Sequence, residues 1–450
     1  MIIQDNTMVS SEDSSLKDIE DQEEEGASRR TERLDEAVAP SAETALPAMD
    51  QDLSGDAGEL AVRTTELTSL DADIRERAHK LCHEYLRGAW KRISAQELVI
   101  KKVSGGLSNL LYYCALPACR PTIHGEPSRV LLRLYGQLHG ERALEGLVTE
   151  AVIFTMLSES QRGPRLLGVF PGGRLEEYIP ARPLLTRELS DPVLSQLVAQ
   201  KLAQIHMMDV PINKEPRWLW DTMNRWLDSI QDFTSLKHED PVSKTRANKL
   251  MSYSLRLELD WLKEFLVSIR SPVVFCHNDL QEGNILLRLD GEESQVSQPE
   301  LVVIDFEFCS YNYRGFDFAN HMCEWVYDYS NEEPPYFWAS HENFPSLKEQ
   351  EHFLESYLQV IHKEKHGSTQ AITRNELDQL LRELQAFTLA SHFFWGLWSV
   401  CYASISTIPF DYWEYGEVRF EAYFKHKAHL LNAADESSAS KNITDLMKSL

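Results

Sequence analysis

Residues 275–287 read Phe-Cys-His-Asn-Asp-Leu-Gln-Glu-Gly-Asn-Ile-Leu-Leu, and residues 303–307 read Val-Ile-Asp-Phe-Glu. Asp279 and Asn284 lie five residues apart in the first stretch, and Asp305 follows the apolar start of the second. Apolar, β-prone runs flank these polar residues, which is typical of short loops between strands. The two stretches therefore predict neighbouring strands whose ends bring two carboxylates and one amide close together.

These residue types at this spacing are typical of phosphoryl transfer from a nucleotide. In that chemistry an Asp orients the attacking hydroxyl, while an Asn five residues later and an Asp-Phe pair on the next strand hold magnesium. Mg²⁺ prefers oxygen ligands and keeps several waters, so one amide and one carboxylate suffice. We therefore predict Asp279, Asn284 and Asp305 as catalytic residues, with Asn284 and Asp305 as metal ligands. His277 is expected to be a hydrogen-bonded structural histidine.

An enzyme of this kind also needs an ATP-binding region upstream of the loop: a glycine turn over the phosphates, a cation on the third strand and a helical acid. Arg133 is the predicted cation, because its planar guanidinium can hold a phosphate through two hydrogen bonds. Glu150, in a helical run, is its expected ion-pair partner. The glycine turn could instead be a plain hairpin turn, and Glu150 could instead be a surface glutamate. The predicted phosphate-binding turn consists of Ser104, Gly105, Gly106, Leu107, Ser108, Asn109 and Leu110.

Adenine recognition is expected in the segment 174–180, an extended run that stops at Pro180. We predict that Glu177, Tyr178 and Ile179 contact the nucleotide through backbone groups, so their side-chain identity carries little information.

Acidic and aromatic residues are interleaved densely after Asp305. Trp395 and Trp398 are three residues apart, so they share one helical face and can line the same pocket. Rings backed by carboxylates suit a quaternary ammonium ion, which is attracted to π-faces and donates no hydrogen bonds. The alternative is an aromatic-rich core, but the link to the catalytic loop favours a cation pocket.

Together these motifs resemble the eukaryotic choline/ethanolamine kinases, from about Asp71 to about Lys427. The resemblance implies an α+β, two-lobed protein kinase-like fold, with an antiparallel sheet in a small N-terminal lobe and a larger, mostly α-helical C-terminal lobe. The motifs that carry it are Ser-Gly-Gly-Leu-Ser-Asn (104–109), Leu-Leu-Arg-Leu-Tyr-Gly (131–136), the catalytic loop, Ile-Asp-Phe-Glu (304–307), Ser-Tyr-Asn-Tyr-Arg-Gly-Phe-Asp (310–317) and Phe-Trp-Gly-Leu-Trp-Ser (394–399).

The resemblance also implies an activity. It predicts a cytoplasmic enzyme, a homodimer or a heterodimer with a paralogue, that phosphorylates choline and also ethanolamine with MgATP, the first step of phosphatidylcholine synthesis. Gln281 joins Arg133 as an implied nucleotide contact. The implied choline-binding residues are Asp279, Glu307, Phe308, Glu324, Tyr329, Trp395, Trp398, Tyr412 and Tyr415.

Two residues depart from the family pattern, since Phe308 and Cys309 stand where Tyr and Ser are usual. Phe308 keeps the π-face but loses the hydroxyl. The preference between choline and ethanolamine stays open at this point, because a primary ammonium needs hydrogen-bond acceptors and a trimethylammonium does not.

Charge and composition divide the chain of 450 residues, whose formal net charge is −25. Segment 1–70 holds 18 Asp and Glu but only 5 Lys and Arg, and no aromatic residue. We predict that it is a disordered acidic tail. Order is expected to begin with a helix over 71–90. We assign the N-terminal helix and ATP-binding lobe to 71–180, the lobe with the catalytic loop and choline pocket to 181–433, and a second disordered tail to 434–450.

Periodicity in the C-terminal lobe predicts mostly helices. The stretch 384–410 has no Asp, Glu, Lys or Arg and is long enough to span a bilayer. Its Ser, Thr, His and clustered rings, and the lack of a basic flank, favour a buried helix with no transmembrane segment. A surface loop is expected over 239–247 and a hairpin loop over 290–299. The predicted helices lie near 192–207, 218–230, 250–269, 348–363 and 373–402.

Composition also argues against several functions. The acidic balance disfavours nucleic-acid binding. Seven cysteines without a Cys-x-x-Cys pair indicate a reducing compartment and argue against a disulfide framework or a zinc site. The remaining alternatives are an ethanolamine-preferring kinase, a kinase for another hydroxyl compound such as an aminoglycoside, and a catalytically silent cation-binding scaffold. The intact Asp279, Asn284, Asp305 and Arg133 argue against the scaffold.

Overall fold

The computed structural model describes residues 71–103, 109–135, 141–231, 241–289, 299–367, 371–403, 405–406 and 408–448. Its N-terminal lobe contains a five-stranded antiparallel sheet with the strand order β1-β2-β3-β5-β4. Val130, Leu132 and Leu134 alternate along β3 and are buried, as expected for a strand with one face on a core. The strands are β1 (Val99–Val103), β2 (Asn109–Ala115), β3 (Arg129–Tyr135), β4 (Leu166–Phe170) and β5 (Gly173–Glu177).

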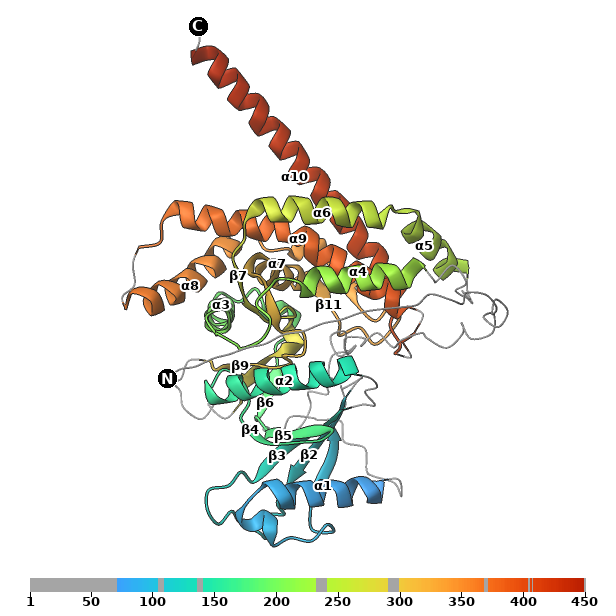
Figure 1. Cartoon of the computed structure of the whole chain (residues 1–450), viewed down its shortest axis with the longest axis vertical. Coiled ribbons are helices and arrows are strands. Elements are labelled where there is room, and N and C mark those ends of the chain that lie inside the picture. Colours follow the sequence, from blue (N-terminus) through green and yellow to red (C-terminus); the bar gives the residue numbers. More distant parts are fainter. Residues whose placement is uncertain are drawn as a thin grey trace, which may run out of the picture. The chain divides into compact units, whose positions relative to one another are not determined.

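Helices cover this sheet on both faces (Figure 1). α1 (Asp71–Tyr85) places Ala78 and Cys82 in a core cluster with residues of β1, β2 and β3. α2 (Glu141–Glu159) lies on the other face, and its Ile153 and Leu157 belong to a core cluster of the C-terminal lobe. α2 thus packs against both lobes.

The C-terminal lobe is mostly helical (Figure 1). Its short strands form a three-stranded sheet in the order β6-β8-β9 and two separate antiparallel pairs, β7 with β10 and β11 with β12. The strands are β6 (Ala181–Pro183), β7 (Val273–Cys276), β8 (Ile285–Arg288), β9 (Leu301–Val303), β10 (Ser310–Tyr313), β11 (Tyr327–Asp328) and β12 (Trp338–Ala339). The helices are α3 (Pro192–His206), α4 (Trp218–Gln231), α5 (Pro241–Ser252), α6 (Leu255–Ile269), α7 (Arg314–Glu324), α8 (Leu347–His366), α9 (Arg374–Tyr402) and α10 (Tyr412–Lys448). The predicted α+β architecture, with a small antiparallel sheet and a larger helical lobe, is confirmed.

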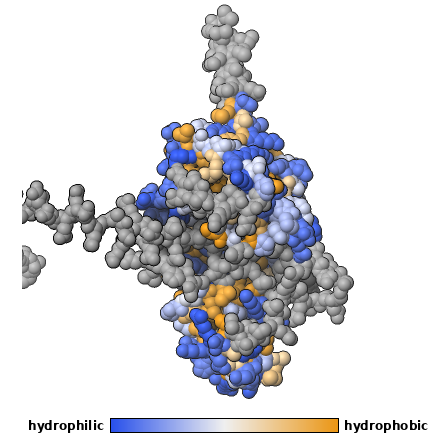
Figure 2. Space-filling model, turned by 90° about the vertical axis from the view of Figure 1, so that its right-hand side faces the viewer, coloured by the Kyte–Doolittle hydropathy of each residue, from blue (hydrophilic) through white to orange (hydrophobic). Residues whose placement is uncertain are grey.

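α9 forms the centre of this lobe. Nearly every residue from Leu384 to Tyr402 is buried, and the helix packs against α4, α6, α7, α8 and α10. No helix within the described residues is long and apolar enough to cross a membrane, so the expected buried helix is confirmed. On the face shown in Figure 2, hydrophilic residues cover most of the described surface, and apolar residues form smaller areas between them.

Several boundaries differ from the predictions. The first helix ends at Tyr85, and Trp90 lies in a separate 3₁₀ turn, η2 (Gly88–Lys91). Gly88, its first residue, has a φ of +63°, which favours glycine. The predicted surface loop over 239–247 is wrong from Pro241 onward, because α5 begins there and buries Ala247 and Leu250. A break at 253–254 separates α5 from α6.

The segment boundaries at the two ends of the chain stay predictions. The predicted acidic tail, 1–70, lies outside the described residues. The backbone of α10 is helical to Lys448, beyond position 434, where a disordered tail was expected. This stretch contains no proline and no glycine, so nothing in its local sequence stops the helix.

Candidate active site

The catalytic loop joins β7 to β8 through the 3₁₀ turn η5 (Glu282–Asn284). The Nδ2 atom of Asn284 donates to the backbone oxygen of Asp279 at 2.9 Å and to its Oδ2 at 2.8 Å. Asp279 is 2% exposed and Asn284 4%. The short turn therefore holds the carboxylate and the amide against each other.

Asp317 at the start of α7 supports this loop. Its carboxylate accepts from the backbone N–H groups of His277 at 2.7 Å and Asn278 at 2.6 Å, and it lies 3.0 Å from Nε2 of His206. Burial raises its pKa, but the hydrogen bond and charge of His206 outweigh this and hold the pKa below its ordinary value. Asp317 thus stays ionised and fixes the loop backbone.

His277 has the structural role predicted for it. Its Nε2 lies 3.0 Å from the backbone oxygen of Ile304, and its Nδ1 lies 3.3 Å from the backbone N of Asp279. Burial lowers the pKa of the ring, so a neutral imidazole links the two quoted sequence stretches.

Asp305 follows β9 with φ +62°. This left-handed conformation is uncommon for a residue other than glycine and is often found at functional sites. The backbone N of Ile304 donates to the backbone oxygen of Asn284 at 3.0 Å. Burial raises the pKa of Asp305, while the charges of Arg133, His277 and Arg174 act to lower it. Asn284 and Asp305, the predicted metal ligands, therefore belong to hydrogen-bonded neighbouring segments.

Two buried cations of the N-terminal lobe come from adjacent strands. Arg133 on β3 and Arg174 on β5 are cross-strand partners, an arrangement that is destabilising unless the charge is compensated. Glu176 compensates both, because its carboxylate lies 3.5 Å from Nε of Arg133 and 2.9 Å from Nε of Arg174. Arg133, Arg174 and Glu176 are 8%, 5% and 3% exposed. Sequence reasoning found one of these two arginines.

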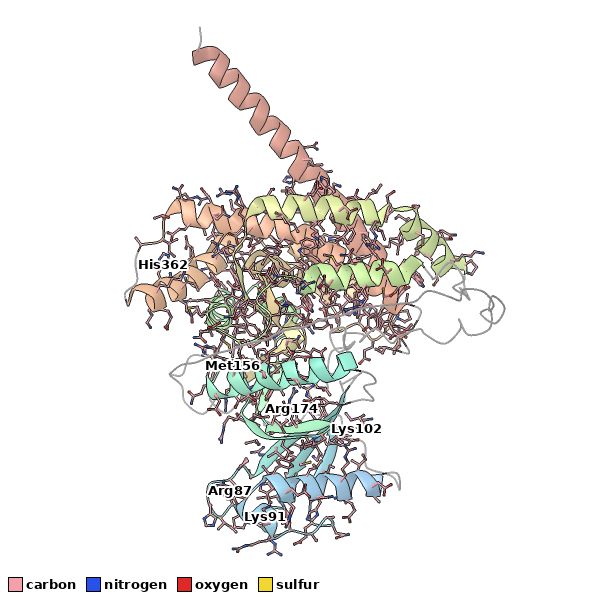
Figure 3. All side chains as sticks on the ribbon, in the orientation of Figure 1. Arg87, Lys91, Lys102, Met156, Arg174 and His362 are labelled. Carbon is pink, nitrogen blue, oxygen red and sulfur yellow. The ribbon has the colours of Figure 1, made fainter. Side chains whose placement is uncertain are left out.

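Glu150 has a different partner from the one predicted. Its carboxylate pairs with Arg174, which lies between the sheet and α2 (Figure 3). The Arg174 guanidinium also lies 4.1 Å from the ring centre of Phe154. The pair predicted for Arg133 and Glu150 is therefore replaced by a network in which Arg174 joins α2 to the sheet.

The structure describes only some of the other residues predicted to bind ATP. Residues 104–108 and the side chain of Asn109 lie outside the described part of the chain, and Leu110 on β2 is 43% exposed. Gln281 is buried and accepts from the backbone N of Gly283 at 2.9 Å. Its role toward ATP stays a prediction.

The segment predicted to bind adenine, 174–180, begins within β5 and continues beyond its end. Glu177 is the last residue of β5, and its Oε2 accepts from the backbone N of Arg165 at 3.1 Å. The Tyr178 ring meets Tyr113 edge-on at 4.8 Å between centroids, and Ile179 is buried. The segment is thus anchored through its side chains, which is compatible with nucleotide contacts through the backbone.

The aromatic residues predicted for the acceptor come together around α9 and the start of α10. Trp395 and Trp398 are edge-to-face at 5.5 Å between centroids, Trp398 lies 5.5 Å from Tyr412, and Phe308 lies 6.1 Å from Trp395. Nε1 of Trp395 donates to Asn320 at 2.7 Å. Among the described residues, the buried Nε1 of Trp398 has no hydrogen-bond partner. The shared helical face predicted for the two tryptophans is present.

A hydrogen-bonded group of tyrosines and charges completes the cluster. The hydroxyl of Tyr329 donates to Oε2 of Glu324 at 2.8 Å and lies 2.8 Å from the hydroxyl of Tyr415. Arg419 of α10, which sequence reasoning missed, is 0% exposed and pairs with Glu324. Its Nε donates to the Tyr415 hydroxyl at 2.9 Å, and its guanidinium lies 3.7 Å from the ring centre of Tyr327. The spacing of four between Tyr415 and Arg419 was the available signal.

Negative charge connects the acceptor cluster to the catalytic loop. Burial, followed by the charges of Glu324 and Asp305, raises the pKa of Asp279 well above its usual range. Burial and Glu324 do the same for Glu282. A divalent cation held by oxygens and a cationic substrate would each relieve this concentration of carboxylates.

A two-lobed fold with this catalytic loop, buried arginines in the sheet lobe and aromatic rings beside the loop defines a protein kinase-like phosphotransferase with a small-molecule acceptor. The sequence profile described as choline/ethanolamine kinase matches residues 100–424. Because this match spans well over half of the sequence, the chain belongs to the choline/ethanolamine kinase family.

Individual relatives agree with this assignment. Human "Choline/ethanolamine kinase" is 48% identical over 370 residues, which are 82% of this chain and 90% of that protein. Mouse "Choline kinase alpha" is 44% identical over 79% of this chain and 81% of its own length. The crystal structure of choline kinase from Cryptosporidium parvum superposes with a TM-score of 0.64 at 26% identity, covering 80% of this chain and 97% of that one.

Proposed function

We propose that this chain transfers the γ-phosphoryl group of ATP to the hydroxyl of choline, and also of ethanolamine, as the first step of phosphatidylcholine synthesis. The observation that carries the proposal is the connection between two sites: Asn320, which accepts from Nε1 of Trp395 at 2.7 Å, also donates to the backbone oxygen of Asn278 in the catalytic loop at 3.5 Å. The charge of Glu324, a member of the aromatic acceptor cluster, acts on the carboxyl of Asp279, the residue that faces the reacting hydroxyl in this reading.

The reaction is an in-line displacement. The choline oxygen forms a bond to the γ-phosphorus while the bond from that phosphorus to the bridging oxygen of ADP breaks, and Asp279 orients the hydroxyl and accepts its proton. ADP then leaves with the electrons of the broken bond. We assign phosphate contacts to Arg133 and Arg174. Both guanidinium groups are buried, and their positive charges act to lower the pKa of Asp305.

We propose Mg²⁺ as the cofactor, held by Asn284 and Asp305. The donor set fits this ion, because an amide oxygen and a carboxylate are the hard ligands that it prefers. When bound, Mg²⁺ neutralises charge on the phosphates. Asp279 lies in the same loop as Asn284, and the hydrogen bond between the two side chains fixes their relative position.

The acceptor cluster favours choline over ethanolamine. The hydroxyls of Tyr329 and Tyr415 bond to each other, Glu324 is paired with Arg419, and Phe308 offers no hydroxyl. A primary ammonium would find these acceptors already engaged, whereas a trimethylammonium needs mainly π-faces and a negative field.

Steady-state ADP release with MgATP and either choline or ethanolamine tests this proposal. We expect a lower KM for choline, and loss of turnover with retained ATP binding in Asp279→Asn. Trp398→Ala should raise the KM for choline far more than that for ATP, whereas Trp261→Ala, on α6, serves as a control outside the site. A lower KM for ethanolamine would overturn the substrate order, and a near-normal rate in Asp279→Asn would overturn the role of Asp279.

We further propose a cytoplasmic enzyme that works as a homodimer or as a heterodimer with a paralogue. All seven cysteines are free and six of them are buried, which supports a reducing compartment. Light scattering of the purified chain, with and without a co-expressed paralogue, would reveal the assembly.

A further inference from the structure

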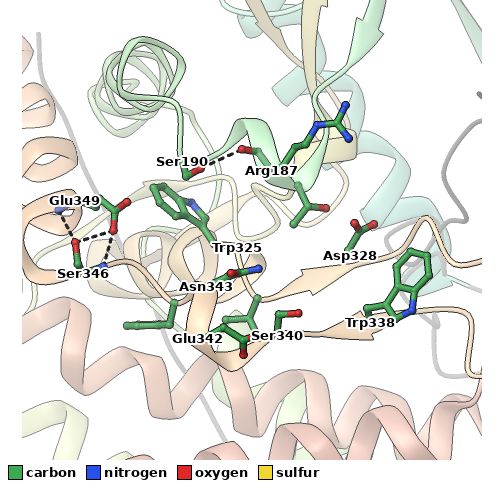
Figure 4. Close-up of a pocket in the computed structure, with 13 residues that line it drawn as sticks. Arg187, Ser190, Trp325, Asp328, Trp338, Ser340, Glu342, Asn343, Ser346 and Glu349 are labelled. Carbon is green, nitrogen blue, oxygen red and sulfur yellow. Dashed lines mark hydrogen bonds between the residues drawn. The ribbon is translucent and has the colours of Figure 1, made fainter. Parts of the chain in front are cut away.

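A cavity of about 660 Å³ lies in the C-terminal lobe, and none of the predicted acceptor residues lines it. Four segments line it: the 3₁₀ turn η3 (Thr186–Glu188), the β11–β12 hairpin, the 3₁₀ turn η6 (His341–Asn343) and the first turn of α8. Figure 4 shows Trp338 and Asp328 at one end of this cavity and Ser346 and Glu349 at the other. The volume suits an organic molecule of moderate size.

The cavity combines negative charge with exposed indole. Its charged residues are three acids, Asp328, Glu342 and Glu349, against one cation, Arg187. Among the ion pairs of the described residues, none involves Asp328 or Glu342, and Oδ1 of Asp328 accepts from the backbone N–H of Ser330 at 2.9 Å. Trp338 is 51% exposed, an unusual exposure for so large an apolar ring. Carboxylates beside an open indole attract a cation that carries apolar groups.

Two other classes of ligand fit poorly. An anion would meet an excess of two negative charges. An inorganic metal ion needs several ligand atoms close together. In the described part of the chain, the residues that bring three such atoms within 4.8 Å of one another are His206, Cys276 and Asp317, and these lie outside the cavity. The acids of the cavity are therefore spread around a wide space, which fits an organic cation instead.

The cavity also touches the active-site framework. Asp328 pairs with Trp338 across the β11–β12 hairpin, and the neighbouring Tyr327 is fully buried against Arg419 of the acceptor cluster. On another wall, Thr186 donates to Glu282 of the catalytic loop at 3.3 Å. One hairpin thus borders the cavity through Asp328 and Trp338 and the acceptor cluster through Tyr327.

We propose that this cavity is a second binding site for an organic ammonium ion, separate from the acceptor site and formed by Trp338, Asp328 and Glu342. The chemistry fits either free choline or a polyamine. The inference does not depend on the substrate of the reaction, because none of these three residues belongs to the proposed acceptor site.

Calorimetric titration of the full chain with choline and, separately, with spermidine tests the site. For wild type we expect two choline sites, or one spermidine site that choline displaces. In Trp398→Ala, which weakens the acceptor site, one choline site should persist. The double variant Asp328→Asn/Glu342→Gln should weaken this persistent site at least tenfold. Glu333→Gln, in the same hairpin loop but outside the cavity, should leave it unchanged.

The outcomes separate the two proposals. A single choline site in wild type that Trp398→Ala removes, with no spermidine binding, would overturn the second site and leave the acceptor site intact. Residual binding that the cavity double variant does not weaken would also overturn it. Quenching of indole fluorescence by spermidine, absent in Trp338→Phe, provides a readout that does not require the acceptor-site variant to fold.

Discussion

At the scale of single residues, Arg419 explains how buried carboxylate and aromatic groups coexist in the acceptor cluster. It pairs with Glu324 and bonds to Tyr415 while fully buried. We predict that Arg419→Met raises the KM for choline about tenfold or more and that for ATP less than about twofold. Removing one partner of a buried ion pair costs roughly 3–5 kcal/mol, and a tenfold change corresponds to about 1.4 kcal/mol.

Arg419→Lys is the matched control, because it keeps the charge and should restore part of the affinity for choline. Both variants are compared by initial rates over a matrix of choline and ATP concentrations. Equal losses for the two substrates would show that Arg419 only stabilises the fold.

His321 gives a residue-scale prediction about pH. Its Nδ1 lies 2.8 Å from the backbone oxygen of Leu280, and its Nε2 accepts from Nε1 of Trp325 at 3.4 Å. Burial lowers its pKa from 6.5 to about 4. Between pH 6.5 and about pH 4, His321 therefore binds a proton in the unfolded chain but not in the folded chain. The contribution of neutral His321 to the free energy of unfolding is complete above pH 6.5 and is lost as the pH falls.

The measurement compares wild type with His321→Gln, which can still donate to Leu280. The difference in unfolding free energy should change by up to about 1.4 kcal/mol per pH unit between pH 6.5 and 4, to the disadvantage of wild type at low pH. His429→Gln, on α10, is the control. A difference that does not vary with pH would contradict the lowered pKa.

At the scale of elements, α5 holds the start of α10 beside the acceptor cluster. Arg246 of α5 contacts Asp411 at 3.0 Å, Glu414 at 2.6 Å and Glu417 at 3.2 Å. Since Tyr412 and Tyr415 lie on this turn of α10, we predict that Arg246→Gln raises the KM for choline about fivefold, the equivalent of ~1 kcal/mol. The KM for ATP should not change.

Initial-rate kinetics check this prediction, with Arg374→Gln, an exposed ion-pair variant at the start of α9, as control. High salt should raise the choline KM of wild type in the same direction, because partly exposed ion pairs are screened. An unchanged choline KM in Arg246→Gln would mean that packing alone positions the turn.

Packing between α9 and α10 depends on a glycine. A Cβ added at Gly396 would lie 2.8 Å from the fully buried Phe420 ring, whereas one added at Gly146 of α2 would meet nothing within 4 Å. We predict that Gly396→Ala lowers the free energy of unfolding by about 1–3 kcal/mol. Gly146→Ala should raise it by up to ~1 kcal/mol, because alanine favours a helix. Urea titrations measure both, and a stabilising Gly396→Ala would contradict the close packing.

The same elements show what could be predicted from sequence. Asp279 and Asn284 lie on one short loop, and Trp395 and Trp398 share one helical face, so short spacing alone placed each pair together. Arg174 could not be chosen as the partner of Glu150, because that choice depends on the register of β3 against β5. α5 was missed because its only buried residues are Ala247 and Leu250, too few for a periodic pattern.

At the scale of the whole molecule, nucleotide is expected to stabilise the fold by linking groups of both lobes. Asp305 belongs to the C-terminal lobe, and the charges that act to lower its raised pKa include Arg133 and Arg174 of the sheet lobe. We predict that MgATP at a hundredfold excess over its Kd raises the free energy of unfolding by about 2.7 kcal/mol. ATP with a chelator should give a much smaller rise, because the phosphates would then meet the carboxylates unshielded.

Thermal unfolding with MgATP, with ATP plus chelator, and with Mg²⁺ alone separates the stabilisation due to the nucleotide from the stabilisation that requires Mg²⁺. In Asp305→Asn the part of the stabilisation that requires Mg²⁺ should vanish, while the apo form should gain stability, because burial of this carboxyl raises its pKa and so opposes its charged form. Asp209→Asn, whose side chain is 82% exposed, should respond as wild type does. Equal stabilisation by ATP with and without the chelator would rule out Asp305 as a metal ligand and would leave the two arginines as the main nucleotide contacts between the lobes.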